Sequence, residues 1–167
     1  MEIDSLQKLY VEELKDIYSA EKQILQALPK MAKKATNEQL RAAFQEHLEQ
    51  TRGQVERLDR IFERLGKSSR GKKCKGMEGL LEEGKEVLEE DMDDEVRDAA
   101  MIAAAQRVEH YEIAAYGTVR TYAELLGEKG DAKLLQQTLN EEGDTDKKLS
   151  QLAESTVNLE ALESVEA

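Results

Sequence analysis

Hydrophobic residues recur at helical spacing over four long stretches of the chain. The pattern predicts helices over about residues 4–34, 37–65, 93–126 and 131–154. A shorter amphipathic stretch, 77–91, predicts a fifth helix, which two glycines weaken. We expect this helix to be part of the crossover and to lie outside the core. We therefore expect an all-α protein.

The residues that flank these stretches are typical of helix ends. "TNE" at 36–38 is an N-cap signal for the second long helix, and Gly66 ends that helix. Gly127 ends the third long helix in the same way. Pro29 is the only proline, and we expect it to kink the last turns of the first helix or to end that helix early.

The lengths of the connections predict the topology. Short turns join the first two long helices and the last two, so each pair is expected to form an antiparallel hairpin. About 27 residues separate the hairpins, enough to run back along the bundle. Two hairpins and one long crossover make a ferritin-like four-helix bundle, which we expect to occupy residues 1–154. Residues 155–167 are expected to be a frayed C-terminal tail.

Polar residues interrupt the predicted inner face of every long helix near its middle. On the first helix that face carries Leu14, Tyr18, Glu21, Leu25 and Leu28. In chain order they are Glu21, then His47 with Thr51 and Gln54, then Glu109 and Glu112, and finally Glu142 and Asp146. An α-helix rises about 1.5 Å per residue, so equal counts from a hairpin turn mean equal height. Glu21 is then level with Thr51, and Glu112 is level with Asp146. Five carboxylates and one imidazole are expected to meet in one layer.

Such a layer needs a source of positive charge. An ionised carboxylate in an apolar core costs several kcal/mol unless a cation meets it. Arg120 is the only cationic side chain that the pattern places nearby, and one arginine cannot neutralise five acids. Either several acids are protonated or the layer holds metal ions. Carboxylates with few imidazoles suit iron or manganese, and di-metal bundles use this inward arrangement. The predicted ligands are Glu21, His47, Glu109, Glu112, Glu142 and Asp146.

Each of these residues has a simpler interpretation when taken alone. A single inward glutamate is most often paired or reaches solvent, and His47 is typical of a core histidine bonded to Thr51 and Gln54. Tyr18 and Tyr116 are typical core aromatics. For the whole set, the alternative to a metal site is a proton-sharing hydrogen-bond network in a helical interaction protein.

Composition and charge narrow the possible partners and the compartment. The 167 residues are enough for one domain with a real core, and the net charge of −12 argues against a nucleic-acid partner. The single cysteine, Cys74, cannot form an internal disulfide. The first residues have no secretory signal, and no apolar run approaches the roughly 20 residues that span a membrane. We expect a soluble cytoplasmic protein with no membrane partner.

Two blocks carry a resemblance to a known family. "LYVEELKDIYSAEKQILQALPKMAKKATNEQLRAAFQEHLEQTRGQVERLDRIFERLG" and "EVRDAAMIAAAQRVEHYEIAAYGT" resemble the YciE/YciF family of ferritin-like stress proteins, and the likeness spans about residues 4–154. The resemblance implies a rubrerythrin-like bundle, a homodimer and a di-metal centre, but no established reaction. Apolar residues outside the inner faces also favour a second buried face and hence a dimer: Ile24, Ile61, Ile102 and Leu125.

The ligand pattern departs from that of ferritin-like proteins in general. That pattern has one Glu on each of two helices and a Glu-x-x-His pair on each of the other two. Glu21 fits it, but Phe44 stands three residues before His47, and Thr145 stands three residues after Glu142. If metals bind, we expect redox chemistry with peroxide or oxygen. Glu112 and Glu142 would bridge two ions, and Glu21, Glu109 and Asp146 would be terminal ligands beside His47. Tyr18 or Tyr116 would be a hydrogen-bonding or electron-supplying neighbour.

Overall fold

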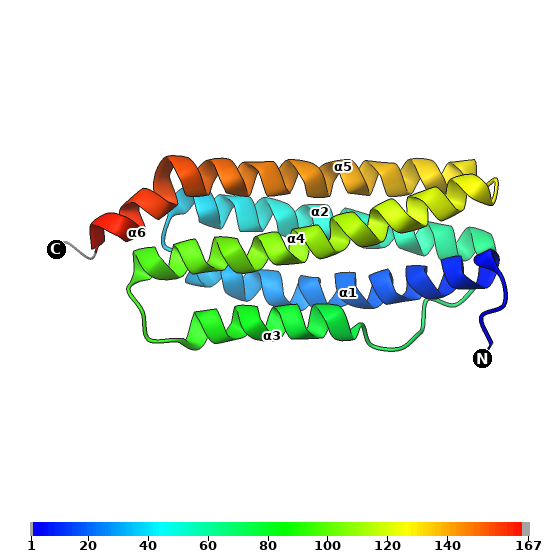
Figure 1. Cartoon of the computed structure of the whole chain (residues 1–167), viewed down its shortest axis with the longest axis horizontal. Helices are drawn as coiled ribbons and strands as arrows, with labels where there is room; N and C mark the ends of the chain where they lie inside the picture. Colours follow the sequence, from blue (N-terminus) through cyan, green and yellow to red (C-terminus); the bar gives the residue numbers. More distant parts are fainter. Residues whose placement is uncertain (1, 165–167) are drawn as a thin grey trace.

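The structure is a computed structural model that describes residues 2–164, and these residues contain helices and no strand. In chain order the helices are α1 (Leu6–Lys34), α2 (Glu38–Leu65), α3 (Lys75–Glu89), α4 (Asp94–Leu125), α5 (Lys129–Leu152), the π-helical turn η1 (Ala153–Val157) and α6 (Asn158–Ser164). The four long helices α1, α2, α4 and α5 run side by side as a bundle (Figure 1).

The connections follow the predicted topology. α1 and α2 form one antiparallel hairpin, and α4 and α5 form the other (Figure 1). The crossover between the hairpins carries α3, which packs along α1 and α4 on the outside of the bundle. The prediction of an all-α bundle with two hairpins and one long crossover is confirmed.

The helix ends agree with most of the sequence signals. The Asn37 side chain accepts a hydrogen bond from the backbone N–H of Leu40 at the start of α2. Gly66 has φ 64° and Gly127 has φ 75°, a region that favours glycine and ends a helix. Pro29 does not end α1 early, because the helix continues to Lys34.

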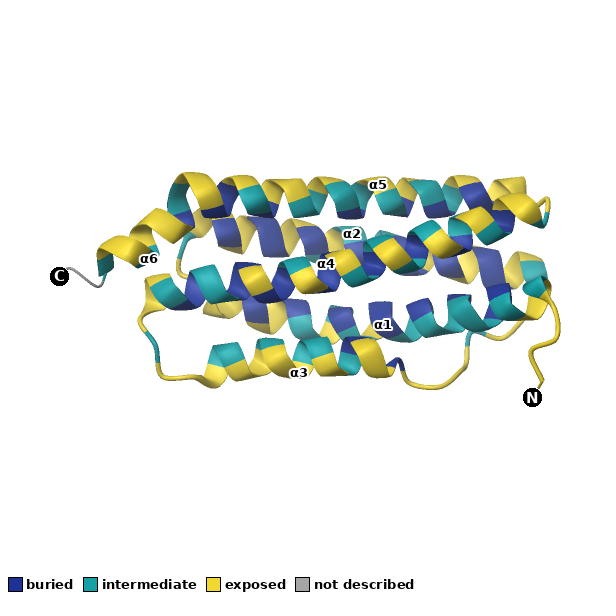
Figure 2. Ribbon diagram, viewed as in Figure 1, coloured by how far each residue is buried: buried dark blue, intermediate teal, exposed yellow. Residues whose placement is uncertain are grey.

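The polar layer divides the hydrophobic core into two apolar clusters. One contains Leu28, Leu40, Phe44, Met101 and Leu149, and it extends toward the α1–α2 turn. The other contains Tyr10, Leu14, Leu58, Phe62 and Leu135, and it extends toward the α4–α5 turn. Figure 2 shows the buried faces of the long helices turned toward one another. Apolar burial on both sides of the layer supplies the stability of the bundle.

The inner face of α1 is rotated from the predicted one. Ile17 and Ile24 lie in the core, whereas Tyr18 and Leu25 are only half-buried. The ring of Tyr18 packs edge-to-face on Phe62, with 5.9 Å between the ring centroids. The rotation follows from packing, because a helix buries the stripe that its neighbours cover.

The apolar residues that favoured a dimer are mostly buried within the single chain. Ile24, Ile61 and Ile102 are each at most 2% exposed inside the bundle. Leu125 is 72% exposed and is the one member of this group that faces solvent. The prediction that these residues form a second apolar face is therefore wrong for three of the four, and the homodimer is implied by the family resemblance alone.

The end of the chain differs from the frayed tail that we expected. Residues 155–164 continue as helix through η1 and α6. Val157 is 1% exposed and packs in the same apolar cluster as Leu149, which explains why this segment is ordered. Residues 165–167 lie outside the described part of the chain, and the division at residue 154 stays a prediction.

A buried carboxylate ties the start of α4 to the α1–α2 turn. Asp98 is 2% exposed, and it accepts hydrogen bonds from the Thr36 backbone N–H (3.0 Å), the Thr36 hydroxyl (2.6 Å) and the Asn37 backbone N–H (2.8 Å). These three hydrogen bonds stabilise the negative charge of Asp98 without a salt bridge, because hydrogen bonds to an ionised carboxylate are short and strong.

Asp98→Ala is expected to lower the free energy of unfolding by about 3 kcal/mol, because it leaves three donors without an acceptor. Asp94→Ala is the matched control on the same helix turn. Its carboxylate is 65% exposed, so we expect a change below about 1 kcal/mol. Urea unfolding followed by circular dichroism measures both changes, and equal values for the two variants would contradict the structural role of Asp98.

Candidate metal centre

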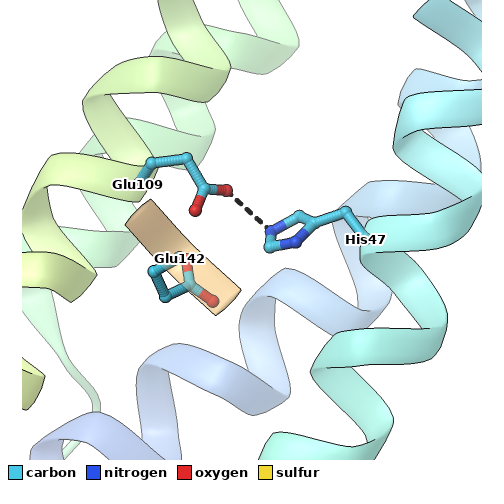
Figure 3. Close-up of side chains that lie close together, drawn as sticks. All are labelled: His47, Glu109 and Glu142. Atoms are coloured by element: carbon cyan, nitrogen blue, oxygen red, sulfur yellow. Dashed lines mark ion pairs between the residues drawn. The ribbon is translucent and has the colours of Figure 1, made fainter. Parts of the chain in front are cut away.

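Five buried side chains from all four long helices meet at mid-bundle. They are Glu21 on α1, His47 on α2, Glu109 and Glu112 on α4, and Glu142 on α5. None of them is more than 5% exposed. Glu109 and Glu112 are three residues apart and so share one face of α4. Figure 3 shows His47, Glu109 and Glu142 pointing toward one another from three different helices.

The ligand atoms fall into two sets that share one residue. In each set, one atom from every residue lies within 4.8 Å of the others: His47, Glu109 and Glu142 form one set, and Glu21, Glu112 and Glu142 form the other. Glu142 alone belongs to both, whereas the sequence suggested that Glu112 and Glu142 would both bridge. If each set held a cation, Glu142 would be within reach of both.

When the carboxyl groups are ionised, most polar atoms of this cluster have no hydrogen-bond partner. These buried atoms are Oε2 of Glu21, Oε2 of Glu109, both carboxylate oxygens of Glu112 and of Glu142, and both ring nitrogens of His47. The Nε2 atom of His47 lies 2.8 Å from Glu109 Oε1 (Figure 3), but the geometry is not that of a hydrogen bond. Native proteins rarely leave so many buried polar atoms unpaired.

The donor set fits a metal ion. Carboxylate oxygens with one imidazole nitrogen suit iron or manganese. His47 Nε2 and Glu109 Oε1 lie 2.8 Å apart, so one ion would be within reach of both atoms. Metal ions would also supply the partners that the orphaned oxygens lack.

Without a cation, the carboxyl groups must hold protons. Loss of hydration on burial raises the pKa of Glu21 and that of Glu109 to about 7. The same desolvation, followed by repulsion from neighbouring carboxylates, raises the pKa of Glu112 well above its usual range. The pKa of Glu142 is also raised well above that range by burial first and then by Glu109. Within residues 2–164, no lysine or arginine forms an ion pair with these four groups.

A buried tyrosine touches one edge of the cluster. The Tyr116 hydroxyl donates a hydrogen bond to Glu21 Oε1 at 3.0 Å and is fully buried. Thr51 and Gln54 do not bond the imidazole of His47. The Thr51 hydroxyl donates to the backbone carbonyl of His47, and the Gln54 amide donates to Glu141. The ring of His47 therefore has no hydrogen-bond partner, and His47 does not fit the simpler interpretation of a hydrogen-bonded core histidine.

Asp146 lies outside both sets of ligand atoms. Its side chain is 20% exposed, and Oδ2 lies 3.1 Å from Nε2 of His110, which is itself mostly exposed. Asp146 follows Glu142 by four residues, which rotates it about 40° around α5 and raises it by one turn. That displacement carries Asp146 to the rim, beside the outer face of α4.

The nearby cation is not the one that the pattern suggested. Arg120 turns toward Thr121 and does not reach the cluster. The sequence analysis missed Arg57, which donates to the Thr138 hydroxyl at 2.9 Å and to both oxygens of Glu141 at 2.6 and 2.9 Å. The sequence signal that could have identified Arg57 is its position three residues after Gln54, which places it on a neighbouring face of α2. Because Glu141 holds this charge, the four buried carboxyl groups remain without a counter-ion.

A small hollow adjoins His47 and Glu109. Its volume is about 20 Å³, which is room for one water-sized molecule. Apart from these two residues and Thr145, its walls are apolar, and they include Ile24, Phe44 and Val108. Space for a small apolar molecule therefore lies directly beside the cluster.

None of the described helices combines the length and the hydrophobicity needed to cross a membrane.

Comparison with known proteins identifies the family. The family model described as "Domain of unknown function (DUF892)" matches residues 5–162. The protein YciF of Escherichia coli (strain K12) is 51% identical over 162 residues, which cover 96% of this chain and 98% of that protein.

Solved structures agree with this result. The crystal structure of the E. coli stress protein YciF superposes with a TM-score of 0.90 at 51% identity, covering 93% of this chain and 99% of that one. The protein YcfI from Rhodopseudomonas palustris gives a TM-score of 0.86 at 45% identity, covering 89% and 95%. A Xanthomonas campestris protein at 23% identity and a TM-score of 0.78 shares the fold, covering 97% and 99%. The predicted resemblance is confirmed, and the chain belongs to the DUF892 family as a relative of the stress protein YciF.

Proposed function

We propose that this protein is a cytoplasmic, ferritin-like stress-response protein that binds one or two iron or manganese ions at the mid-bundle cluster. The observation that carries the proposal is the set of buried oxygens and imidazole nitrogens that have no hydrogen-bond partner. The relationship to the stress protein YciF supports the stress response. The single thiol, Cys74, is free and buried, as suits a reducing compartment.

Each residue of the cluster has a distinct part in this proposal. His47 and Glu109 would hold one ion, Glu21 and Glu112 would hold the other, and Glu142 would contact both. The hydrogen bond from Tyr116 occupies Glu21 Oε1 and leaves Oε2 free for an ion. When bound, the metal would supply redox chemistry with peroxide or oxygen. The surrounding apolar clusters exclude water from these groups, and this strengthens their attraction for a cation.

Metal binding is expected to raise the melting temperature of the wild-type protein. The gain in unfolding free energy follows RT ln(1 + [L]/Kd), or about 2.7 kcal/mol at a hundredfold excess of metal over Kd. Glu112→Gln should abolish most of this gain and leave the metal-free protein no less stable, because an uncharged amide replaces a carboxyl group whose ionisation is opposed by burial. Melting curves with Mn²⁺, or with Fe²⁺ under nitrogen, measure both effects.

Asp146→Asn is the control for this experiment, because Asp146 lies at the rim, and it should keep the full metal-dependent gain. A metal-free hydrogen-bond network predicts the reverse pattern. Metal would then change neither protein, and Glu112→Gln would destabilise the fold by about 1 kcal/mol through a lost hydrogen bond. That pattern would refute the proposed function.

The buried acids also predict a dependence of stability on pH. The pKa of Glu21 and of Glu109 rises from 4.5 to about 7 on folding, so the folded protein binds more protons than the unfolded chain between these values. The free energy of unfolding of the metal-free protein should therefore fall as the pH rises from 4.5 through 7. Metal binding should show the opposite sign and tighten over this range, because ligation releases these protons.

Urea unfolding in the presence of a chelator, from pH 4.5 to 8, measures the first dependence, and metal titration over the same range measures the second. Glu112→Gln is the matched variant, because it removes one titrating group and should flatten the decline in stability. An unchanged slope in this variant would show that the decline arises elsewhere in the strongly acidic chain.

We also propose that the protein forms a homodimer, as the family resemblance implies. Sedimentation equilibrium at micromolar concentration should then show a species of twice 18.9 kDa. A single species of 18.9 kDa over the whole concentration range would contradict the dimer and leave the metal proposal intact.

A further inference from the structure

A second hollow lies between α2 and α5, and His47 forms part of its lining. Its volume is about 60 Å³. The side chains that matter here are Glu46, His47 and Gln50 from α2, and Asp144, Thr145 and Lys148 from α5. Five of these six are polar groups outside the cluster itself, so this hollow differs from the apolar one that lies beyond His47.

His47 separates this hollow from the interior of the bundle. It is the most exposed member of the cluster, at 5%, whereas the four glutamates are at most 2% exposed. Its side chain lines both the outer hollow and the inner one, and Nε2 lies 2.8 Å from Glu109 (Figure 3). Neither ring nitrogen has a hydrogen-bond partner. A cation that comes from the surface along this line would meet the imidazole before it meets any buried carboxylate.

The mouth of the hollow carries opposing charges. Glu46 and Asp144 are exposed carboxylates on the two helices that form it. Lys148, which is 52% exposed, forms an ion pair with Glu46 across the mouth. Below them, the Thr145 hydroxyl donates to Gln50 Oε1 at 3.1 Å and links α5 to α2. The acids attract a divalent cation, while the ammonium group of Lys148 repels it and occupies one of the acids.

We propose that this hollow is the route by which divalent metal ions reach the cluster, with Glu46 and Asp144 guiding the ion inward, Lys148 restraining it, and His47 as the first buried ligand. The inference rests on the proposed metal-binding function. Fixed charges at the mouth of a cleft act mainly on the rate of association, because they stabilise the incoming ion before it reaches its final ligands.

The test is the rate of Co²⁺ binding to the full-length protein, followed by stopped-flow absorbance at low salt. The Glu46→Gln/Asp144→Asn double variant should bind Co²⁺ about tenfold more slowly, and Lys148→Gln should bind it severalfold faster. Both effects should shrink at 0.5 M salt, where exposed charges are screened. The equilibrium Kd should stay within about twofold of the wild-type value, so release to a chelator should change in parallel with binding.

Glu49→Gln is the matched control. Glu49 is a 68% exposed acid on α2 that pairs with Arg52 and does not line the hollow, so this variant should bind Co²⁺ at the wild-type rate. This control removes one charge and the double variant removes two, so equal slowing per charge removed would show a general effect of net charge and would overturn the route. Wild-type rates in both the double variant and Lys148→Gln, with normal Kd values, would overturn the proposed route but would leave the proposed metal site intact. Failure of the wild-type protein to bind Co²⁺, Mn²⁺ or Fe²⁺ at equilibrium would overturn the proposed function and the route with it.

Discussion

The burial of four carboxyl groups at mid-bundle is the constraint on which the rest of the structure depends. Glu21, Glu109, Glu112 and Glu142 lie between two apolar clusters, where water cannot stabilise their charge. Among the described residues 2–164, they have one imidazole beside them and no ion pair with an arginine or lysine. Protons or metal ions must therefore balance them, and the pKa values of the group rise accordingly. The dependence of stability on pH and the proposed binding of metal ions both follow from this balance.

At each end of the bundle, a buried carboxylate has a structural role and is fully hydrogen-bonded. Near the α1–α2 turn, Asp98 accepts three hydrogen bonds from Thr36 and Asn37. Near the α4–α5 turn, Asp131 is fully buried and accepts hydrogen bonds from Tyr10 and Arg64, at 3.0 Å each. Both aspartates have all the partners they need, whereas the acids between them do not. The ends are thus held by paired carboxylates, whereas the oxygens at the middle stay unpaired.

The fold and the site carry different information about function. Relatives at 51%, 45% and 23% identity all share this bundle, so the architecture tolerates wide changes in sequence. A fold of this kind does not define a reaction, and the chemistry must be argued from the side chains at its centre. Here that centre has a single imidazole and a glutamate, Glu142, common to both sets of ligand atoms. The site is thus rich in oxygen ligands and adjoins an apolar hollow on the same side as His47.

The sequence by itself determined the helices, their order and the height of the polar layer, because hydrophobic period, capping residues and connection lengths are local properties. It also placed Glu21, His47, Glu109, Glu112 and Glu142 near one another, since equal counts from a turn mean equal height. Only the tertiary structure decided how far each helix is rotated about its axis. That rotation puts Ile17 and Ile24 rather than Tyr18 and Leu25 in the core, and it leaves Asp146 at the rim. It also decides which glutamate is shared, because a shift of a few tens of degrees moves a carboxylate by several ångströms, and only packing against the neighbouring helices sets that angle.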